Sequence, residues 1–230
     1  MSSGAGNADG SDPIGQMGAR DANSAFNQHQ FQQRQIFGEK RFHFTGEIVA
    51  VHNRNSLTEP CTVDVKPHVK QMDGAGNTTS HDIIYGIAVP RSQSGGSVFI
   101  NDPQVGDPAN FSVLDRDHSS VQANDWVESN PGSYRRHSMS DAIFHGVLPR
   151  KSQPVTQHFM FTDTGIDCAD MNKNTFNSSS AGWNFNGAII DQKGNFTAPG
   201  NVTAGKGSAD QVDLQGHSHS GNGAAPTAGS

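Results

Sequence analysis

Cys61-Thr62-Val63-Asp64-Val65-Lys66 is the stretch that decides the fold class of this chain, because apolar and polar residues alternate along it. Pro60 precedes it and Pro67 follows it, and proline interrupts regular backbone structure. Successive side chains of a β-strand point to opposite faces, so a period of two indicates a strand with one buried face. The stretch therefore predicts a β-strand, and we expect strands around it.

Four further segments have a strand-like pattern, and turns rich in Gly, Pro and Asn separate them: residues 44–51, 83–89, 97–100 and 109–115. Several short strands at close spacing are typical of a small barrel or sandwich. Together with residues 61–66 these segments make five strands, which fit an OB-like barrel. We therefore predict a mainly β fold, with an OB-fold domain over residues 42–135.

Two short helices are expected beside these strands. Residues 23–37 lack Gly and Pro, and Asn23 or Ser24 could cap a helix there. A short helix with so few apolar residues is only marginally stable by itself. We therefore expect it to pack on another chain or a docking partner. Ser138 and Asp141 have the spacing of a capping box, which predicts a short helix and linker over residues 136–153.

Beyond Pro154 the chain consists of short segments with one or two apolar residues each, punctuated by glycines. This pattern is typical of a β-solenoid or an intertwined β-helix, but its period is too irregular for a regular single-chain solenoid. We predict that three chains wind together over residues 154–215. The residues expected on the shared axis are Ile190, Phe196, Val202, Val212 and Leu214.

Composition argues against several classes of function. Hydrophobic residues make up 33% of the 230 residues and charged residues 17%, which favours many short strands over a large single-chain core. The net charge is −6 without a basic run, so no nucleic-acid partner is expected. Residues 1–7 lack the features of a signal peptide, so synthesis in a cytoplasm is expected. Cys61 and Cys168 are predicted to be reduced, buried side chains.

The stretch Gly216-His217-Ser218-His219-Ser220-Gly221 is a candidate metal site. In an extended chain His217 and His219 point the same way, and three chains on an axis would supply six imidazoles. Imidazole suits iron, nickel, copper and zinc, and because zinc usually prefers four ligands, six nitrogens favour iron over zinc. A closed coordination sphere leaves no position for substrate, which indicates a structural metal. The alternative is a solvated tail in which the two histidines have no joint role.

The order of these parts resembles the central spike, or membrane-piercing tip protein, of contractile phage tails. The likeness covers about residues 40–221: the barrel, the stretch Arg135-Arg136-His137-Ser138-Met139-Ser140-Asp141-Ala142-Ile143, the Gly/Asn-rich β-helix and the terminal His-x-His.

The resemblance implies a homotrimer in the virion, at the distal end of the tail baseplate, made in the host cytoplasm. OB-fold domains would form a collar under the tail hub, and residues 1–41 are expected to dock there. A triangular β-helix would end in a tip over residues 216–230, where His217 and His219 of three chains hold one iron ion octahedrally. Such a spike is driven through the host outer membrane and performs no enzymatic reaction.

Two other functions compete with this interpretation. A tail-associated trimeric β-helix could bind carbohydrate or act as a depolymerase. This alternative requires paired carboxylates in a groove. The Asp residues available there show no evident pairing: Asp163, Asp167, Asp170, Asp191, Asp210 and Asp213. A monomeric metal hydrolase could use the His pair with a third protein ligand. We expect Asp115–His118 to be a charged strand end, and Trp126, Trp183 and Phe185 to serve packing rather than sugar stacking.

Overall fold

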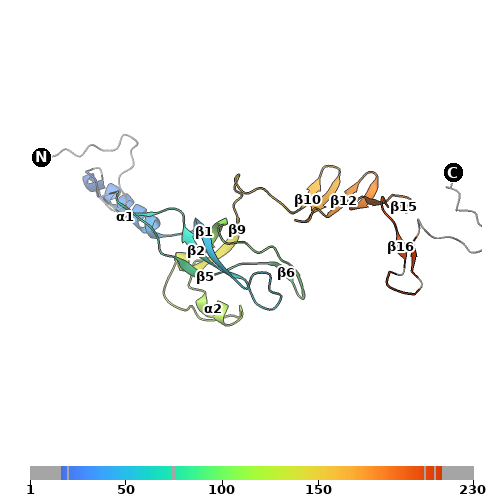
Figure 1. The fold of residues 1–230 in the computed structure, drawn as a ribbon. Helices are drawn as coiled ribbons and strands as arrows, with labels where there is room; N and C mark the ends of the chain where they lie inside the picture. The colour runs from blue at the N-terminus through green and yellow to red at the C-terminus, as the bar shows by residue number, and fades with distance from the viewer. Residues whose placement is uncertain (1–16, 20, 74–75, 205, 210, 214–230) are drawn as a thin grey trace, which may run out of the picture. The chain divides into compact units, whose positions relative to one another are not determined.

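The structure is a computed structural model that describes residues 17–19, 21–73, 76–204, 206–209 and 211–213. The chain divides into two compact units, Met1–Lys151 and Ser152–Ser230 (Figure 1). Strand makes up 37% of the structure and helix 13%, which confirms the predicted mainly β class. Among the described residues, no helix has the length and apolar character needed to cross a membrane.

The first unit contains a closed barrel whose strands are bonded in the order β1-β2-β5-β9-β8. The five strands are β1 (His43–His52), β2 (Thr62–Pro67), β5 (Ile84–Ala88), β8 (Pro108–Val113) and β9 (Ala142–Val147). All neighbours are antiparallel except β5 and β9, which pair in parallel at Ala88 and Ile143. A five-stranded barrel was predicted, and β2 coincides with the alternating stretch that predicted it.

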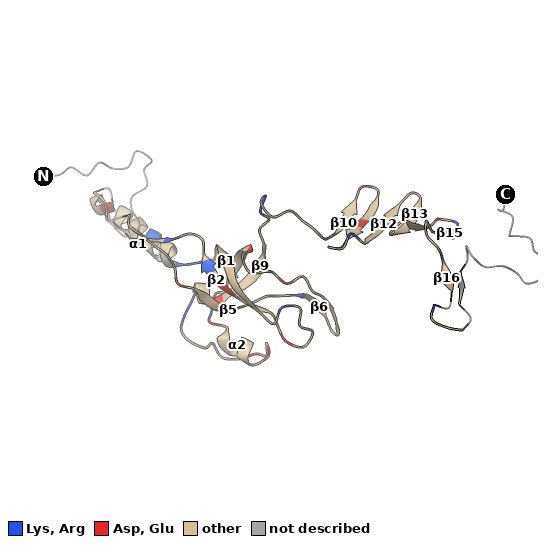
Figure 2. Cartoon of the chain, viewed as in Figure 1, with Lys and Arg blue, Asp and Glu red and all other residues tan. Residues whose placement is uncertain are grey.

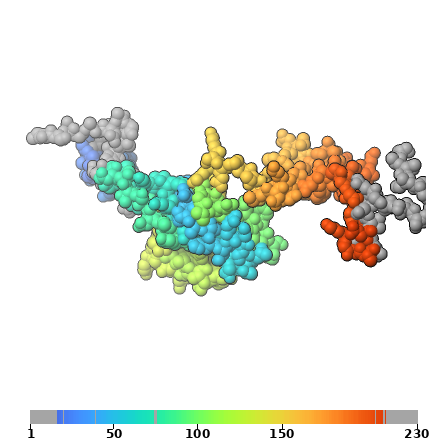
Figure 3. Space-filling model, in the orientation of Figure 1, coloured from blue at the N-terminus to red at the C-terminus, as the bar shows by residue number. Residues whose placement is uncertain are grey.

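The barrel core follows from the alternation along its strands. The buried apolar residues are Ile48, Cys61, Val63, Val65, Ile87, Val89, Ala109, Phe111 and Ala142. Phe111 lies at the centre, with the ring of Phe44 stacked at 5.0 Å between centroids and the ring of Phe144 edge-on at 6.0 Å. Segments far apart in the sequence thus contribute to one core, and their atoms lie packed together in the space-filling view (Figure 3).

Two sequence predictions about the barrel are wrong. Residues 97–100 were expected in it, but β7 (Ser97–Phe99) pairs with β6 (Ser92–Ser94) in a separate, exposed hairpin. The short helix expected after Ser138 is only a 3-10 turn, η2 (Met139–Asp141), and strand β9 follows it. A one-turn helix is unstable alone, whereas β9 gains a ladder with β8 and buries Ala142. The barrel therefore ends at Val147 rather than at residue 135.

The helix predicted over residues 23–37 is present as α1 (Ala25–Glu39), preceded by η1 (Asp21–Asn23). Ser24 caps it, because its Oγ accepts a hydrogen bond of 3.1 Å from the backbone N–H of Asn27. Arg34 forms an ion pair with the buried Asp21 and ties the helix to the preceding turn. The remaining elements of this unit are β3 (Gln71–Met72), β4 (Thr78–Thr79) and α2 (Ser119–Ala123).

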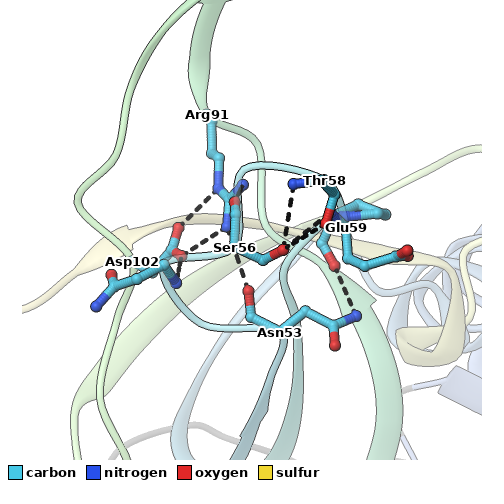
Figure 4. Close-up of polar contacts among 8 residues, drawn as sticks. Asn53, Ser56, Thr58, Glu59, Arg91 and Asp102 are labelled. Carbon is cyan, nitrogen blue, oxygen red and sulfur yellow. Dashed lines mark hydrogen bonds and ion pairs between the residues drawn. The ribbon is translucent and has the colours of Figure 1, made fainter.

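An ion pair between Arg91 and Asp102 holds the β1–β2 loop against the barrel (Figure 4). The guanidinium donates to both oxygens of Asp102, with Nε–Oδ1 at 3.0 Å and Nη2–Oδ2 at 2.7 Å. Its Nη1 donates to the carbonyl oxygen of Ser56 at 2.6 Å, and the N–H of Asn55 donates to Asp102 at 2.7 Å. Burial opposes ionisation of Asp102, but these hydrogen bonds outweigh it and hold its pKa below the ordinary value.

A second cluster fixes the long connection between β8 and β9. Arg135 donates to both oxygens of Asp141 at 2.9 and 2.8 Å, and contacts Asp117 at 3.1 Å. Hydrogen bonds from Ser133 and Ser119 hold the pKa of Asp117 well below its ordinary value. The charged turn at residues 115–118 thus helps to anchor this connection.

Acid is expected to destabilise the barrel through these carboxylates. The pKa values of Asp102 and Asp117 lie below the ordinary 3.8 in the folded chain, so the unfolded chain takes up protons first as the pH falls. The stability they contribute is complete at neutral pH and is lost progressively below about pH 4. Urea unfolding at pH 7 and pH 3 measures this, and an unchanged midpoint would contradict it.

The second unit contains a six-stranded antiparallel sheet in which each strand pairs with the next along the chain (Figure 1). Its strands are β10 (His158–Thr162), β11 (Gly165–Ala169), β12 (Thr175–Ser179), β13 (Gly182–Phe185), β14 (Ala188–Ile190) and β15 (Phe196–Thr197). A separate pair of strands follows, β16 (Thr203–Ala204) and β17 (Val212–Asp213).

Tight turns fix the register of this sheet. Asn186 and Gly187 both have positive φ, 51° and 94°, as a two-residue hairpin turn requires. The β11–β12 and β14–β15 loops share an Asp-x-x-x-Asn pattern, at residues 170–174 and 191–195. In each loop the Asp side chain accepts hydrogen bonds from the backbone N–H and the side-chain amide of the Asn, at 2.7–2.8 Å. The same loop, at residues 73–77, joins β3 and β4 in the first unit.

Candidate functional site

The strand pairing sorts the side chains of the six-stranded sheet onto two faces. Residues directly opposite each other in an antiparallel pair lie on the same face. One row therefore runs from Phe159 through Cys168, Phe176 and Phe185 to Ala188. Alternate positions on the same strands add a second row. We call the whole surface the apolar face: Phe159, Phe161, Ile166, Cys168, Phe176, Ser178, Trp183, Phe185, Ala188, Ile190 and Phe196.

Aromatic rings pack against one another along this face. The rings of Phe176 and Trp183 are stacked, with centroids 5.1 Å apart and planes 6° from parallel. The rings of Phe185 and Phe176 have centroids 4.8 Å apart, and Phe159 meets Phe161 edge-on at 5.4 Å. These contacts give the face a defined aromatic surface before any partner binds.

A single chain leaves the apolar face open to solvent. The exposed fractions are 77% for Phe161, 46% for Phe185 and 56% for Phe196. Among the described residues of the second unit, none is buried. An apolar sheet face needs a second layer to form a core, and a contiguous apolar surface of this kind marks an interaction site.

The opposite face of the sheet, which we call the polar face, suits solvent. Asp167, Asn177 and Asn184 lie opposite one another across the three central strands β11–β13. Nε2 of His158 lies 3.1 Å from Oδ2 of Asp167 on this face. Asp167 is the one charged residue in the six strands, which are otherwise drawn tan in Figure 2. Met160 and Ile189 also lie on this face, opposite Asp167 and Asn184, so it is mixed in character, whereas the apolar face is almost wholly apolar.

The structure brings together some of the residues predicted on the shared axis. Ile190 and Phe196 lie directly opposite each other on the apolar face. Val202 precedes β16 outside the six-stranded sheet, and Val212 belongs to β17. Leu214 lies outside the described residues. Trp183 and Phe185 pack with Phe176, which the sequence interpretation missed although Phe176 alternates with Thr175 and Asn177 as in a strand.

Other predicted sites have different outcomes. His217 and His219 lie outside the described residues, so their joint role stays a prediction. Within the described part of the chain, no group of three or more His, Cys, Asp or Glu side chains is arranged to hold a metal ion. Cys61 is buried, as predicted, and burial raises the pKa of its thiol. Cys168 was expected to be buried, but it is only partly so, because the apolar face is open.

Comparison of the sequence with models of known protein families found no match, and a search of curated proteins found none either. The function must therefore be inferred from the open apolar face, the barrel and the order of the parts along the chain.

Proposed function

We propose that this protein is the central spike of a contractile phage tail. In this role it is a homotrimer at the distal end of the baseplate, beneath the tail hub, and sheath contraction drives it through the host outer membrane. Its action is mechanical rather than enzymatic. The observation that carries the proposal is the open apolar face of a unit in which no described residue is buried.

Three copies supply what one chain lacks. If three apolar faces turn toward a common axis, the aromatic rings of each copy become the core of a three-sided β-structure. Each of its sheets would come from one chain, since the strands pair within the chain, and not from the intertwined strands expected from the sequence. Burying one large apolar side chain contributes about 1.5–3 kcal/mol, and each copy offers several partly exposed ones. The polar faces remain outside in contact with water, which suits a smooth shaft.

The barrel supports the same proposal. Its order β1-β2-β5-β9-β8, with one parallel pair, is consistent with the five-stranded Greek-key barrel called the OB-fold. Three such barrels would form the collar under the hub. Helix α1 leaves Phe26, Ile36 and Phe37 largely exposed, which suits docking to a hub protein.

The tip is the third element of the proposal. His217 and His219 would supply two imidazoles per chain, and hence six from three chains. Imidazole is a ligand of iron, and the resemblance to phage spikes selects this metal. Bound by six protein nitrogens, the ion would pin three chain ends and leave no position for a substrate.

Native mass combined with metal analysis tests the assembly and its tip. We expect a mass of three chains and one iron per three chains, in protein purified without nickel resin. The double variant His217→Ala/His219→Ala should lose the iron, because the sequence of residues 216–230 contains no other histidine. The matched control His68→Ala/His145→Ala removes two exposed histidines elsewhere and should keep it. A monomer, or iron retained by the tip variant, would refute this part of the proposal.

The carboxylates of the second unit speak against a depolymerase. A glycosidase needs a general acid with a raised pKa close to a second carboxylate. Hydrogen bonds from Asn174 hold the pKa of Asp170 below its ordinary value, and Asn195 does the same for Asp191. Asp167 pairs with His158. These carboxylates serve the loops and the polar face of the sheet.

A further inference from the structure

A groove of about 670 Å3 crosses one side of the barrel, between the β1–β2 loop and the segment that contains α2. Leu57, Glu59 and Pro60 form one wall, and Gln122, Asp125 and Trp126 belong to the opposite one. Its floor includes Ala88 and Ile143, where β5 and β9 form their parallel pair. Five-stranded Greek-key barrels bind oligonucleotides and oligosaccharides at the corresponding place, between the loop after the first strand and the connection before the last.

Trp126 presents an aromatic surface to this groove. Its side chain is 52% exposed and lines the groove together with Gln122 and Asp125. Its backbone has a φ of 63°, which bulky residues rarely adopt and which the surrounding structure must enforce. Its N–H donates to the carbonyl of Val121 at 2.8 Å, and the ring of His118 stacks on its ring at 6.1 Å. The hydrogen bond to Val121 thus fixes the backbone of Trp126, and the His118 ring lies against its indole.

Polar side chains in the groove are available to a ligand. Within the described part of the chain, Glu59, Gln122 and Asp125 form no side-chain hydrogen bond, so their oxygens and amide can contact a bound molecule. The basic residue lining the groove is Arg91, and its guanidinium is already committed to Asp102 and Ser56 (Figure 4). The groove thus offers hydrogen bonds and negative charge but no available cation from its lining.

We propose that this groove binds a neutral oligosaccharide of hexopyranose units. The apolar C–H face of one sugar ring would stack on Trp126, while Gln122, Asp125 and Glu59 bind its hydroxyls. A nucleic acid would bring phosphates toward two carboxylates without a cation to neutralise them, which disfavours the other ligand class of such barrels. This inference goes beyond the spike and depends on the barrel alone.

Titration of the full-length protein with four neutral hexasaccharides tests the inference. The chain has two tryptophans, so a Trp183→Phe background leaves Trp126 as the single indole reporter. Cellohexaose, maltohexaose, chitohexaose and mannohexaose are the probes. We expect at least one of them to shift the fluorescence of Trp126 saturably. In calorimetry, Trp126→Ala should weaken that binding by about tenfold or more, since a buried tryptophan anchor dominates such a contact.

Two matched variants and one competing ligand make the outcome decisive. Tyr134→Ala removes a fully exposed aromatic ring outside the groove and should leave the affinity unchanged. Gln122→Ala preserves helix α2 and should weaken binding several-fold. It provides the test of the groove if Trp126→Ala does not fold. The inference is overturned if none of the four sugars binds, if both groove variants bind normally, or if a dT12 oligonucleotide binds there instead. Native mass measured on the same samples reports on the trimer separately.

Discussion

Phe185→Asp is expected to convert the proposed trimer into single chains. Phe185 lies on the apolar face, in contact with Phe176, and is 46% exposed in one chain. The variant would place three carboxylates in the shared core, without cations on that face. An unpaired charge in such a place costs several kcal/mol, and the trimer would contain three. Light scattering after size exclusion would show the mass falling from three chains to one.

Asn184→Asp is the matched control, because it adds the same charge at the preceding residue of β13, which lies on the polar face. Oδ1 of Asn184 accepts the N–H of Gly187 at 2.7 Å, and an aspartate oxygen can accept the same bond. The control should remain a trimer. If it dissociates as readily as Phe185→Asp, or if neither variant dissociates, the apolar face is not the interface.

Arg91→Met is expected to lower the free energy of unfolding of the barrel by about 3–5 kcal/mol, the usual cost of removing one partner of a buried ion pair. The side chains of Arg91 and Asp102 are 11% and 1% exposed. Methionine fills much of the same space but leaves the carboxylate without its counter-charge and the carbonyl of Ser56 without its donor. Urea unfolding monitored by circular dichroism measures the loss.

Arg54→Met controls for the removal of a positive charge near the same loop. Arg54 is exposed and influences Asp102 only through longer-range attraction. Solvent-exposed charges contribute about 0–1 kcal/mol, so this variant should unfold at nearly the urea concentration of the unsubstituted protein. If both variants lost the same free energy of unfolding, any positive charge near the loop would be enough to stabilise it, and the hydrogen-bonded pair of Arg91 and Asp102 would have no special role.

Four of the five barrel strands were predictable from the sequence because their signals are local. The alternation at residues 61–66 and its flanking prolines define β2 without reference to any other part of the chain. Strand β9 shows the limit of this reasoning. Ser138 does cap a turn, as its Oγ accepts from the N–H of Ser140, but the next residues extend because the edge of β8 is available. That edge comes from a strand some thirty positions earlier, which a local pattern does not reveal.

The apolar face was predictable only in part, for a related reason. Ile190 and Phe196 were predictable because they belong to short segments with few apolar residues, bounded by glycines. Their membership of one face with Phe176 depends on register, and register is set by the loops rather than by the strands. The Asp-x-x-x-Asn loop at residues 170–174 was a visible signal, since it recurs at residues 191–195.

These loops also determine which genetic changes the sheet can tolerate. Side chains alternate between faces, so one residue gained or lost within a loop would exchange inside and outside for every strand beyond it. A substitution on the polar face alters one contact with water. A change of length at residues 170–174 would instead shift the register between β11 and β12, and with it the position of the three strands that follow β12. Relatives of this protein should therefore diverge freely in outward-facing strand positions while keeping the lengths of these short connections.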